Sequence, residues 1–233
     1  MKGSYLPFDT CTKLAIKHAF ALEGLRLQDE DYDELTNWFA SYNTKFEDAE
    51  VFLRYVAPGL TKTLQDRGNK GHILSILVFT NGDPGMIGQA VDDSAYMEEV
   101  FGPSDGPSRE LGADNVRVLP PCSVHGVKAY KPHPAAYNYL RCKWIPEHSV
   151  AKSEVPAEVF LVSSNEWDVA GAESAGLGTI WVDRARKGRM DALGMELRSG
   201  SGGFVINGLQ EVGWVVEKIL SGEKPNVDAM SDI

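Results

Sequence analysis

The chain has 233 residues, of which 43% are hydrophobic and 24% charged, and its formal net charge is −10. This composition fits a globular protein with one medium domain and a small addition, and no stretch reaches the roughly 18 uninterrupted apolar residues of a membrane helix. The acidic balance, with basic residues scattered along the chain, argues against nucleic acid as a partner.

Three cysteines, Cys11, Cys122 and Cys142, are an odd number without the spacing of metal ligands, and no apolar signal segment follows Met1. We therefore expect free thiols in a reducing, cytoplasmic setting.

Two amphipathic helices are predicted at the start of the chain. Residues 9–23 place apolar side chains at helical spacing, with Asp9 or Thr10 as the N-cap and Gly24 as the C-terminal stop. Residues 29–42 form a second helix behind an acidic first turn. Two consecutive helices without a strand between them indicate a helical cap.

From residue 49 onward, predicted helices alternate with predicted strands. The helices lie at 49–65, 87–97, 134–141, 167–175 and 209–220, and the strands at 73–79, 116–119, 159–163, 179–182 and 204–206. This alternation predicts an α/β fold, a Rossmann-like doubly wound parallel sheet with a small N-terminal α-helical cap.

The domain boundaries follow from these elements and from composition. Residues 1–45 are the predicted cap remnant, 46–221 the α/β core and 222–233 a disordered tail. Residues 102–121, rich in Gly, Pro, Ser and Asp, predict a long surface excursion around one short strand.

Three polar loops follow in the order in which a doubly wound sheet would present them. They are Thr80 to Gly82, Lys128 to Pro132 and Ser163 to Asp168. Ligands of open α/β sheets bind at the carboxyl ends of the strands. The loops therefore predict one crevice for a small molecule, in which hydroxyls, amides and the charge of Lys131 could hold an anion.

The three loops resemble, in order and content, the motifs of the haloacid dehalogenase superfamily, particularly its type II 2-haloacid dehalogenase branch. Phe79 to Gly82 is similar to the family's second motif, Ala129 to Pro132 with Tyr137 to the lysine motif, and Ser163 to Asp168 to the last motif. With residues 181–184 the likeness covers nearly the whole chain.

The resemblance implies catalytic roles by matching position. Lys131 would hold an attacking aspartate and the substrate carboxylate, and Asp168 would position water or Lys131. Ser163 and Asn165 would support the attacking group and the leaving group. Ser163 stands where phosphatase relatives carry another acid, so the resemblance implies no metal, and we expect no cofactor.

The resemblance also implies side chains that bind substrate. Thr80 and Asn81 would contact it, Trp167 and Tyr137 would line and brace the pocket, and Phe8 is similar to a pocket aromatic of the cap. Taken singly, these residues have simpler explanations. Thr80 and Asn81 could cap the next helix, Lys131 could be a solvated lysine, and Asp168 could complement a helix dipole.

The family's first motif, a strand that ends in an attacking aspartate, has no clear counterpart. Asp9 is the one candidate, but Pro7 would then lie in a central strand, where it has no amide to donate. Residues 5–15 align better with the family's cap, where an aromatic precedes a helix. On that alignment the attacking aspartate, the first strand and the cap arginine are unmatched.

Three functions follow from this. We predict first an enzyme that cyclises or isomerises an organic metabolite without a covalent intermediate, as a pericyclase does in specialised metabolism. The alternative is a 2-haloacid dehalogenase or related hydrolase whose nucleophile is missing or decayed at Asp9, and the third is a non-catalytic binding protein. His125 and His133 are weaker acid–base candidates. The expected partner is a small-molecule substrate, and a homodimer stays open.

Overall fold

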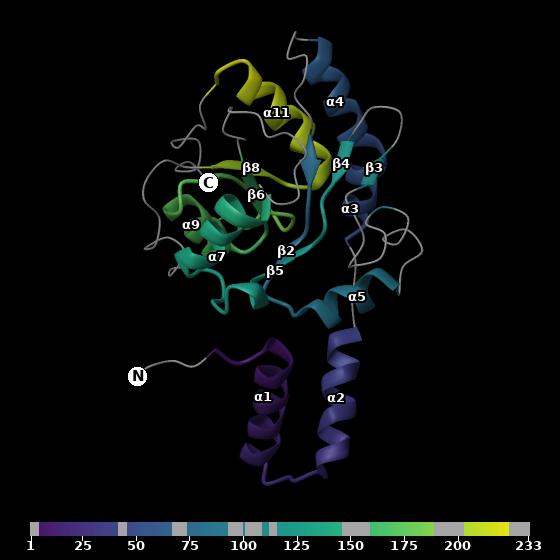
Figure 1. Cartoon of the computed structure of the whole chain (residues 1–233), viewed down its shortest axis with the longest axis vertical. Helices are drawn as coiled ribbons and strands as arrows, with labels where there is room; N and C mark the ends of the chain where they lie inside the picture. The colour runs from purple at the N-terminus through teal and green to yellow at the C-terminus, as the bar shows by residue number, and fades with distance from the viewer. Residues whose placement is uncertain are drawn as a thin grey trace.

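The computed structural model describes residues 5–41, 46–66, 74–92, 100, 109–111, 116–145, 159–188 and 203–223. Within these residues, two helices stand apart from an α/β core (Figure 1). α1 (Phe8–Leu22) and α2 (Asp29–Ser41) pack on each other, and α2 also contacts α5 (Pro84–Asp92) of the core. The two predicted N-terminal helices are confirmed.

Backbone geometry sets both ends of α1. Pro7 occupies the N-cap position without a side-chain cap, and its extended backbone starts the helix one residue before Asp9. Asp9 and Thr10 lie within the first turn and hydrogen-bond to each other, so the predicted capping by either residue is wrong. Gly24, with a φ of 72°, ends the helix as predicted, through backbone bonds of the Schellman type.

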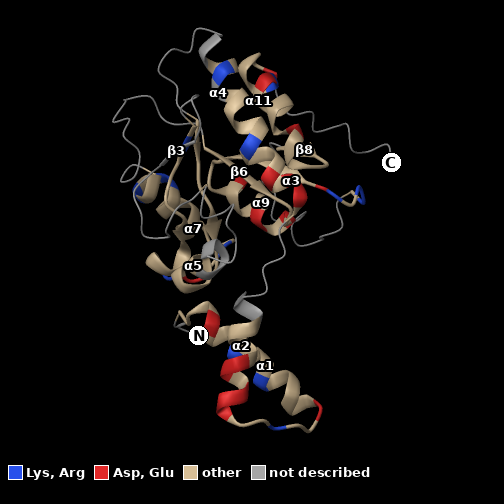
Figure 2. Ribbon diagram, turned by 90° about the vertical axis from the view of Figure 1, so that its right-hand side faces the viewer, with Lys and Arg blue, Asp and Glu red and all other residues tan. Residues whose placement is uncertain are grey.

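Exposed ion pairs connect the two helices. Lys13 pairs with Asp33, and Lys17 pairs with Asp29. Acidic side chains gather on α2 (Figure 2), and those in its first turn complement the helix dipole. Since exposed pairs contribute little stability and are screened by salt, these two ion pairs add little to the pairing of α1 and α2.

The core follows in chain order. It contains α3 (Glu47–Val51), the π-helix η1 (Phe52–Val56), α4 (Ala57–Asp66), β1 (Ser75–Ile76), β2 (Phe79–Thr80), α5, β3 (Arg109–Leu111), β4 (Val116–Val118), β5 (Cys122–Ser123), the 3₁₀-helix η2 (Val124–Gly126), α7 (Pro134–Tyr139), the π-helix η3 (Leu140–Trp144), β6 (Phe160–Ser163), α9 (Glu166–Ser174), β7 (Gly178–Val182), β8 (Phe204–Ile206), the 3₁₀-helix η4 (Leu209–Glu211) and α11 (Val212–Leu220).

Parallel pairing dominates the strands. β6, β7 and β8 form one parallel ladder, β1 pairs parallel with β4, and β2 pairs parallel with β5. The ladder between the chain paths 75–80 and 116–123 is interrupted because Pro120 and Pro121 have no amide to donate. The α/β fold with parallel strands is confirmed, while β5 and the antiparallel edge strand β3 were not predicted.

Helices cover both faces of the β6–β8 ladder. Leu161 pairs with Thr179 and packs with Tyr137 and Ala172 of α7 and α9. Ile180, on the opposite face by the pleat of the strand, packs with residues of α4 and α11 such as Leu60, Val212 and Val215. This two-sided burial is that of a doubly wound sheet.

Some predicted segments fall outside the described residues. These are the C-terminal part of the helix predicted at 87–97, the cap–core boundary near residue 45 and the tail from residue 224. The domain boundaries therefore stay a prediction. None of the described helices combines the length and the apolar character needed to cross a membrane.

Gly171 lets α9 approach the loop that precedes α7. A Cβ at Gly171 would lie 2.6 Å from the Tyr137 hydroxyl and 2.7 Å from Pro132 Cβ. Gly171→Ala should therefore lower the free energy of unfolding by about 2 kcal/mol. As a control, Gly59→Ala on α4, where a Cβ meets nothing within 4 Å, should raise it by about 0.5–1 kcal/mol. Chemical denaturation measures both, and a stabilising Gly171→Ala would contradict this packing.

Asp48, at the start of α3, hydrogen-bonds to residues that follow β7 and β8. It accepts two hydrogen bonds from Arg184, at 2.9 and 3.1 Å, and one from the Leu209 N–H at 3.0 Å. Burial alone would raise the pKa of Asp48, but the bonds from Arg184 and Leu209 outweigh it, so the pKa is lowered. Ionised Asp48 therefore stabilises the fold at neutral pH, and this stabilisation is lost as the pH falls through the lowered pKa.

Asp48→Asn should lower the free energy of unfolding by about 2 kcal/mol at pH 7. The difference from the parent protein should shrink in acid, because the parent protonates Asp48 there. Denaturation at several pH values measures it, and Asp29→Asn, at the exposed pair with Lys17, should change little. A difference that stays constant down to pH 3 would refute the role given to the Asp48 charge.

Candidate active site

Lys131 brings the three predicted loops together. Its Nζ donates to Asp168 Oδ2 at 2.8 Å and to the Phe79 carbonyl at 3.1 Å, and it lies 4.7 Å from the centre of the Phe79 ring. The Lys131 and Asp168 side chains are only 8% and 4% exposed. The simpler explanation, in which Lys131 is a solvated lysine, is therefore wrong. The predicted convergence of the three loops on one place is confirmed.

Both carboxylate oxygens of Asp168 accept hydrogen bonds. Besides Lys131, Ser163 Oγ donates to Oδ2 at 3.2 Å and the Tyr137 hydroxyl donates to Oδ1 at 2.7 Å. Burial, and then the Asp168 charge, raise the pKa of Tyr137, which keeps its hydroxyl as a donor at any ordinary pH. Asp168 therefore fits the predicted positioning role, because its carboxylate has no free oxygen for attack.

Asn81 fixes the backbone of the lysine loop. Its Oδ1 accepts from the Lys131 N–H at 2.9 Å, and its Nδ2 donates to the Lys131 carbonyl at 3.3 Å. Thr80 Oγ1 accepts from the Gly82 N–H at 2.9 Å. Neither residue caps the next helix, because Asp83 does so by accepting from the Met86 N–H at 3.1 Å. Direct contact of Thr80 and Asn81 with substrate stays a prediction.

The last loop presents the exposed amide side chain of Asn165. Ser163 Oγ accepts from the Asn165 N–H at 3.2 Å, which holds the loop at the start of α9. The Asn165 side chain is exposed and has no hydrogen bond to any described residue, and Trp167 beside it is half-buried. Asn165 is therefore the predicted site residue best placed to reach a ligand directly.

Two predicted substrate contacts have different surroundings. Tyr137 is fully buried, so it braces Asp168 and cannot line a pocket. Phe8 lies at the start of α1 with its ring 6.4 Å from that of Tyr130, next to Lys131 in sequence. The helix after Lys131 starts at Pro134, as predicted, with His133 as its N-cap.

His125 and His133 each contact a group outside the Lys131–Asp168 pair. His133 Nδ1 accepts from the Ala135 N–H at 3.1 Å, and His125 Nδ1 lies 3.3 Å from the Tyr5 hydroxyl. Neither histidine contacts Lys131 or Asp168. Sequence reasoning missed the roles of Tyr5 and Tyr130, although the aromatic directly before the lysine was a usable signal.

Asp9 is on a helix and not at the end of a strand. Residues 5–7 pair with neither β2 nor β6, and within the described ranges no strand joins the free edges of these two strands. Among the described carboxylates, Asp168 alone contacts Lys131. A nucleophile decayed at Asp9 therefore has no support from geometry, and the alignment of residues 5–15 with a cap agrees with α1.

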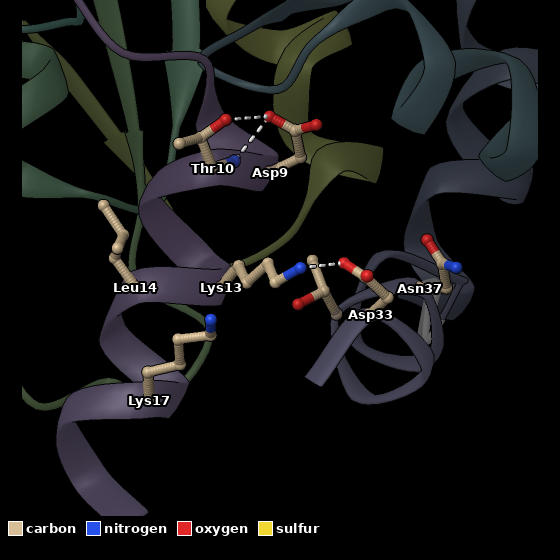
Figure 3. A pocket seen from close by; sticks show the side chains of 8 residues that line it. Asp9, Thr10, Lys13, Leu14, Lys17, Asp33 and Asn37 are labelled. Carbon is tan, nitrogen blue, oxygen red and sulfur yellow. Dashed lines mark hydrogen bonds and ion pairs between the residues drawn. The ribbon is translucent and has the colours of Figure 1, made fainter. Parts of the chain in front are cut away.

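A groove of about 390 Å³ lies between α1 and α2 (Figure 3). Its lining includes Asp9, Thr10, Lys13 and Asp33, whereas Lys131 and Asp168 do not border it. The charges of Lys13 and Asp33 neutralise each other across it. The groove is thus a feature of the helix pair, separate from the site at Lys131.

No protein-family model matches the chain. Among curated proteins it is similar to the (S)-2-haloacid dehalogenase of Xanthobacter autotrophicus, with 28% identity over 203 residues that cover 86% of this chain and 62% of that protein. It is also 30% identical to (S)-2-haloacid dehalogenase 4A of Burkholderia cepacia over 128 residues, 54% of this chain and 43% of the relative. The chain thus spans less than two thirds of the length of these relatives.

The chain is also similar in fold to solved structures of L-2-haloacid dehalogenases. The L-2-haloacid dehalogenase from Xanthobacter autotrophicus superposes with a TM-score of 0.58 at 23% identity, over 91% of this chain and 77% of that one. The same enzyme with chloropropionic acid covalently bound gives a TM-score of 0.56. The chain is thus similar in sequence to (S)-2-haloacid dehalogenases, and it has the fold of the L-2-haloacid dehalogenases.

Proposed function

We propose that this protein is a hydrolase of the 2-haloacid dehalogenase type, which replaces the halogen of a short 2-halocarboxylate by hydroxyl. One observation carries the proposal, the buried Lys131–Asp168 pair at the carboxyl end of β2. The similarity to (S)-2-haloacid dehalogenases supports it.

Lys131 has a donor to spare. An ammonium group has three N–H bonds, and two of them serve Asp168 and the Phe79 carbonyl. No described residue accepts the third. Since the ammonium is largely removed from water, an anion at this N–H would interact more strongly than it would at an exposed lysine. A carboxylate, of substrate or of an attacking aspartate, matches that position.

The reaction requires a second carboxylate besides Asp168. That group attacks C2 of the substrate, forms a C–O bond and expels halide; water then adds to the acyl carbon of the ester, releases the 2-hydroxy acid and one proton, and restores the carboxylate. The resemblance gives this group a strand beside β2, where the edges of β2 and β6 are unpaired in the described ranges.

The described residues have distinct tasks in this proposal. Lys131 neutralises the attacking and substrate carboxylates, and Asp168, Tyr137 and Asn81 hold Lys131 in one position. The exposed amide of Asn165 is available to donate to the departing halide or to the substrate.

The comparisons reverse the order of the functions expected from sequence. A dehalogenase was the alternative to a non-covalent cyclase or isomerase, and the relatives named above are dehalogenases. None of the geometry favours cyclisation over hydrolysis. Hydrolysis is therefore the primary proposal.

Halide release tests the proposal. Purified protein given L-2-chloropropionate should release chloride, as measured by ion chromatography, and Lys131→Met should lower the rate by about 100-fold or more because the charge is lost. Lys128→Met is the matched control, since Lys128 is exposed in the same loop and forms no ion pair with another described residue, and it should leave the rate within about twofold.

Two outcomes would contradict the proposal. A folded protein that releases no halide from L-2-chloropropionate or its bromo analogue is not this kind of hydrolase as isolated. Halide release that Lys131→Met leaves intact would place the chemistry elsewhere. A single turnover in heavy-oxygen water should also label a protein carboxylate, and an unlabelled protein would exclude the ester intermediate.

A further inference from the structure

The helix pair contacts the core in a place directly next to the site lysine. Tyr5, Leu6 and Phe8 lie against His125 and Tyr130, and we call this set the cap–loop contact. α2 supplies a further contact with the core, against α5. Because α1 has no buried residue, its position over the core depends on few interactions.

Tyr130 is the centre of the cap–loop contact. Its hydroxyl donates to the Leu6 carbonyl and lies 4.0 Å from Cys11 Sγ, and its ring lies 5.1 Å from that of Tyr5 and 6.4 Å from that of Phe8. Burial, and then the hydrogen bond with Tyr5, raise the pKa of Tyr130, so the phenol stays a donor at neutral pH.

The loop that presents Tyr130 is fixed on its core side. Ser123 Oγ donates to the Gly82 carbonyl at 2.6 Å, and Asn81 holds both backbone groups of Lys131. Lys128 has a φ of 55°, an uncommon left-handed conformation for a residue with a side chain. The loop is therefore anchored to the core by bonds that do not involve the helix pair.

We infer that Tyr130 is a positioning residue which, through its hydrogen bond to Leu6 and its ring contacts with Tyr5 and Phe8, holds the helix pair over the Lys131 site. The residue after Tyr130 is Lys131 itself, so one short segment fixes both the cap and the charge that binds substrate. The consequence for catalysis rests on the proposed function, whereas the consequence for cap position does not.

Chemistry limits what can replace Tyr130. The Leu6 carbonyl accepts from the hydroxyl, so phenylalanine keeps the ring contacts but loses the tie to the backbone of residue 6. Loss of such a bond changes the equilibrium between held and released cap by about fivefold. Tyr55→Phe is a matched control, because Tyr55 is 72% exposed on η1 and lies outside the contact.

Hydrogen exchange of the full-length chain tests the inference without reference to activity. In Tyr130→Phe, amides in the first turns of α1, such as that of Cys11, should exchange about fivefold faster, while amides of β7 keep their rate. Tyr55→Phe should match the parent protein in both regions. Unchanged α1 exchange in Tyr130→Phe, or equal acceleration in α1 and β7, would overturn the positioning role.

Activity provides a second, separable readout. If the protein releases halide, Tyr130→Phe should raise KM by about fivefold and change kcat less, because a released cap weakens substrate capture more than the chemistry at Lys131. A kcat loss as large as that of Lys131→Met would overturn positioning in favour of a direct catalytic role. If no variant releases halide, the proposed function fails while the exchange result still decides the role of Tyr130.

Discussion

The buried ion pair between Lys131 and Asp168 is the constraint on which the carboxyl edge of the sheet depends. Two charges this well buried must be paired with each other and held by further hydrogen bonds, because an unpaired buried charge costs several kcal/mol, about 3–5 in measured cases. Ser163, Tyr137 and the Phe79 carbonyl meet that demand. Each comes from a different element, so the pair joins β2, α7, β6 and α9 at one point.

Several features of the surrounding fold hold the Lys131–Asp168 pair in place. α9 can approach α7 because Gly171 has no Cβ, and that approach brings the Tyr137 hydroxyl to Asp168. Asn81 fixes the Lys131 backbone, and Tyr130 extends the same loop to the helix pair. The exposed groove between α1 and α2 has no comparable network, since its lysines, Lys13 and Lys17, form single ion pairs with Asp33 and Asp29 at the surface.

Sequence predicted what depends on local pattern. The alternation of helices and strands identified the α/β core, and Gly24 marked the end of α1, because periodicity and glycine conformation are local properties. Strand β3 and the break at Pro120 were missed, because residues 102–121 are rich in Gly, Pro, Ser and Asp and their composition predicts a surface excursion with one short strand, although β3 pairs with β4 close by in sequence. Lys131 and Asp168 could be named from their motifs, but the burial of Tyr137 and the turn of Asn81 toward the Lys131 backbone are tertiary facts. The first choice of function, cyclisation, followed from an unmatched first motif, and the sequence similarity to dehalogenases favours hydrolysis over it.

A double-mutant cycle on the Lys131–Asp168 pair tests the central claim most directly. The free energy of unfolding is measured by chemical denaturation for the parent chain, Lys131→Met, Asp168→Leu and the double variant. We expect each single substitution to cost about 3 kcal/mol or more, and the double variant to be at least as stable as either single one, because no charge is then left buried alone. Single costs that simply add in the double variant, within about 0.5 kcal/mol, would show instead that Lys131 and Asp168 contribute to stability independently.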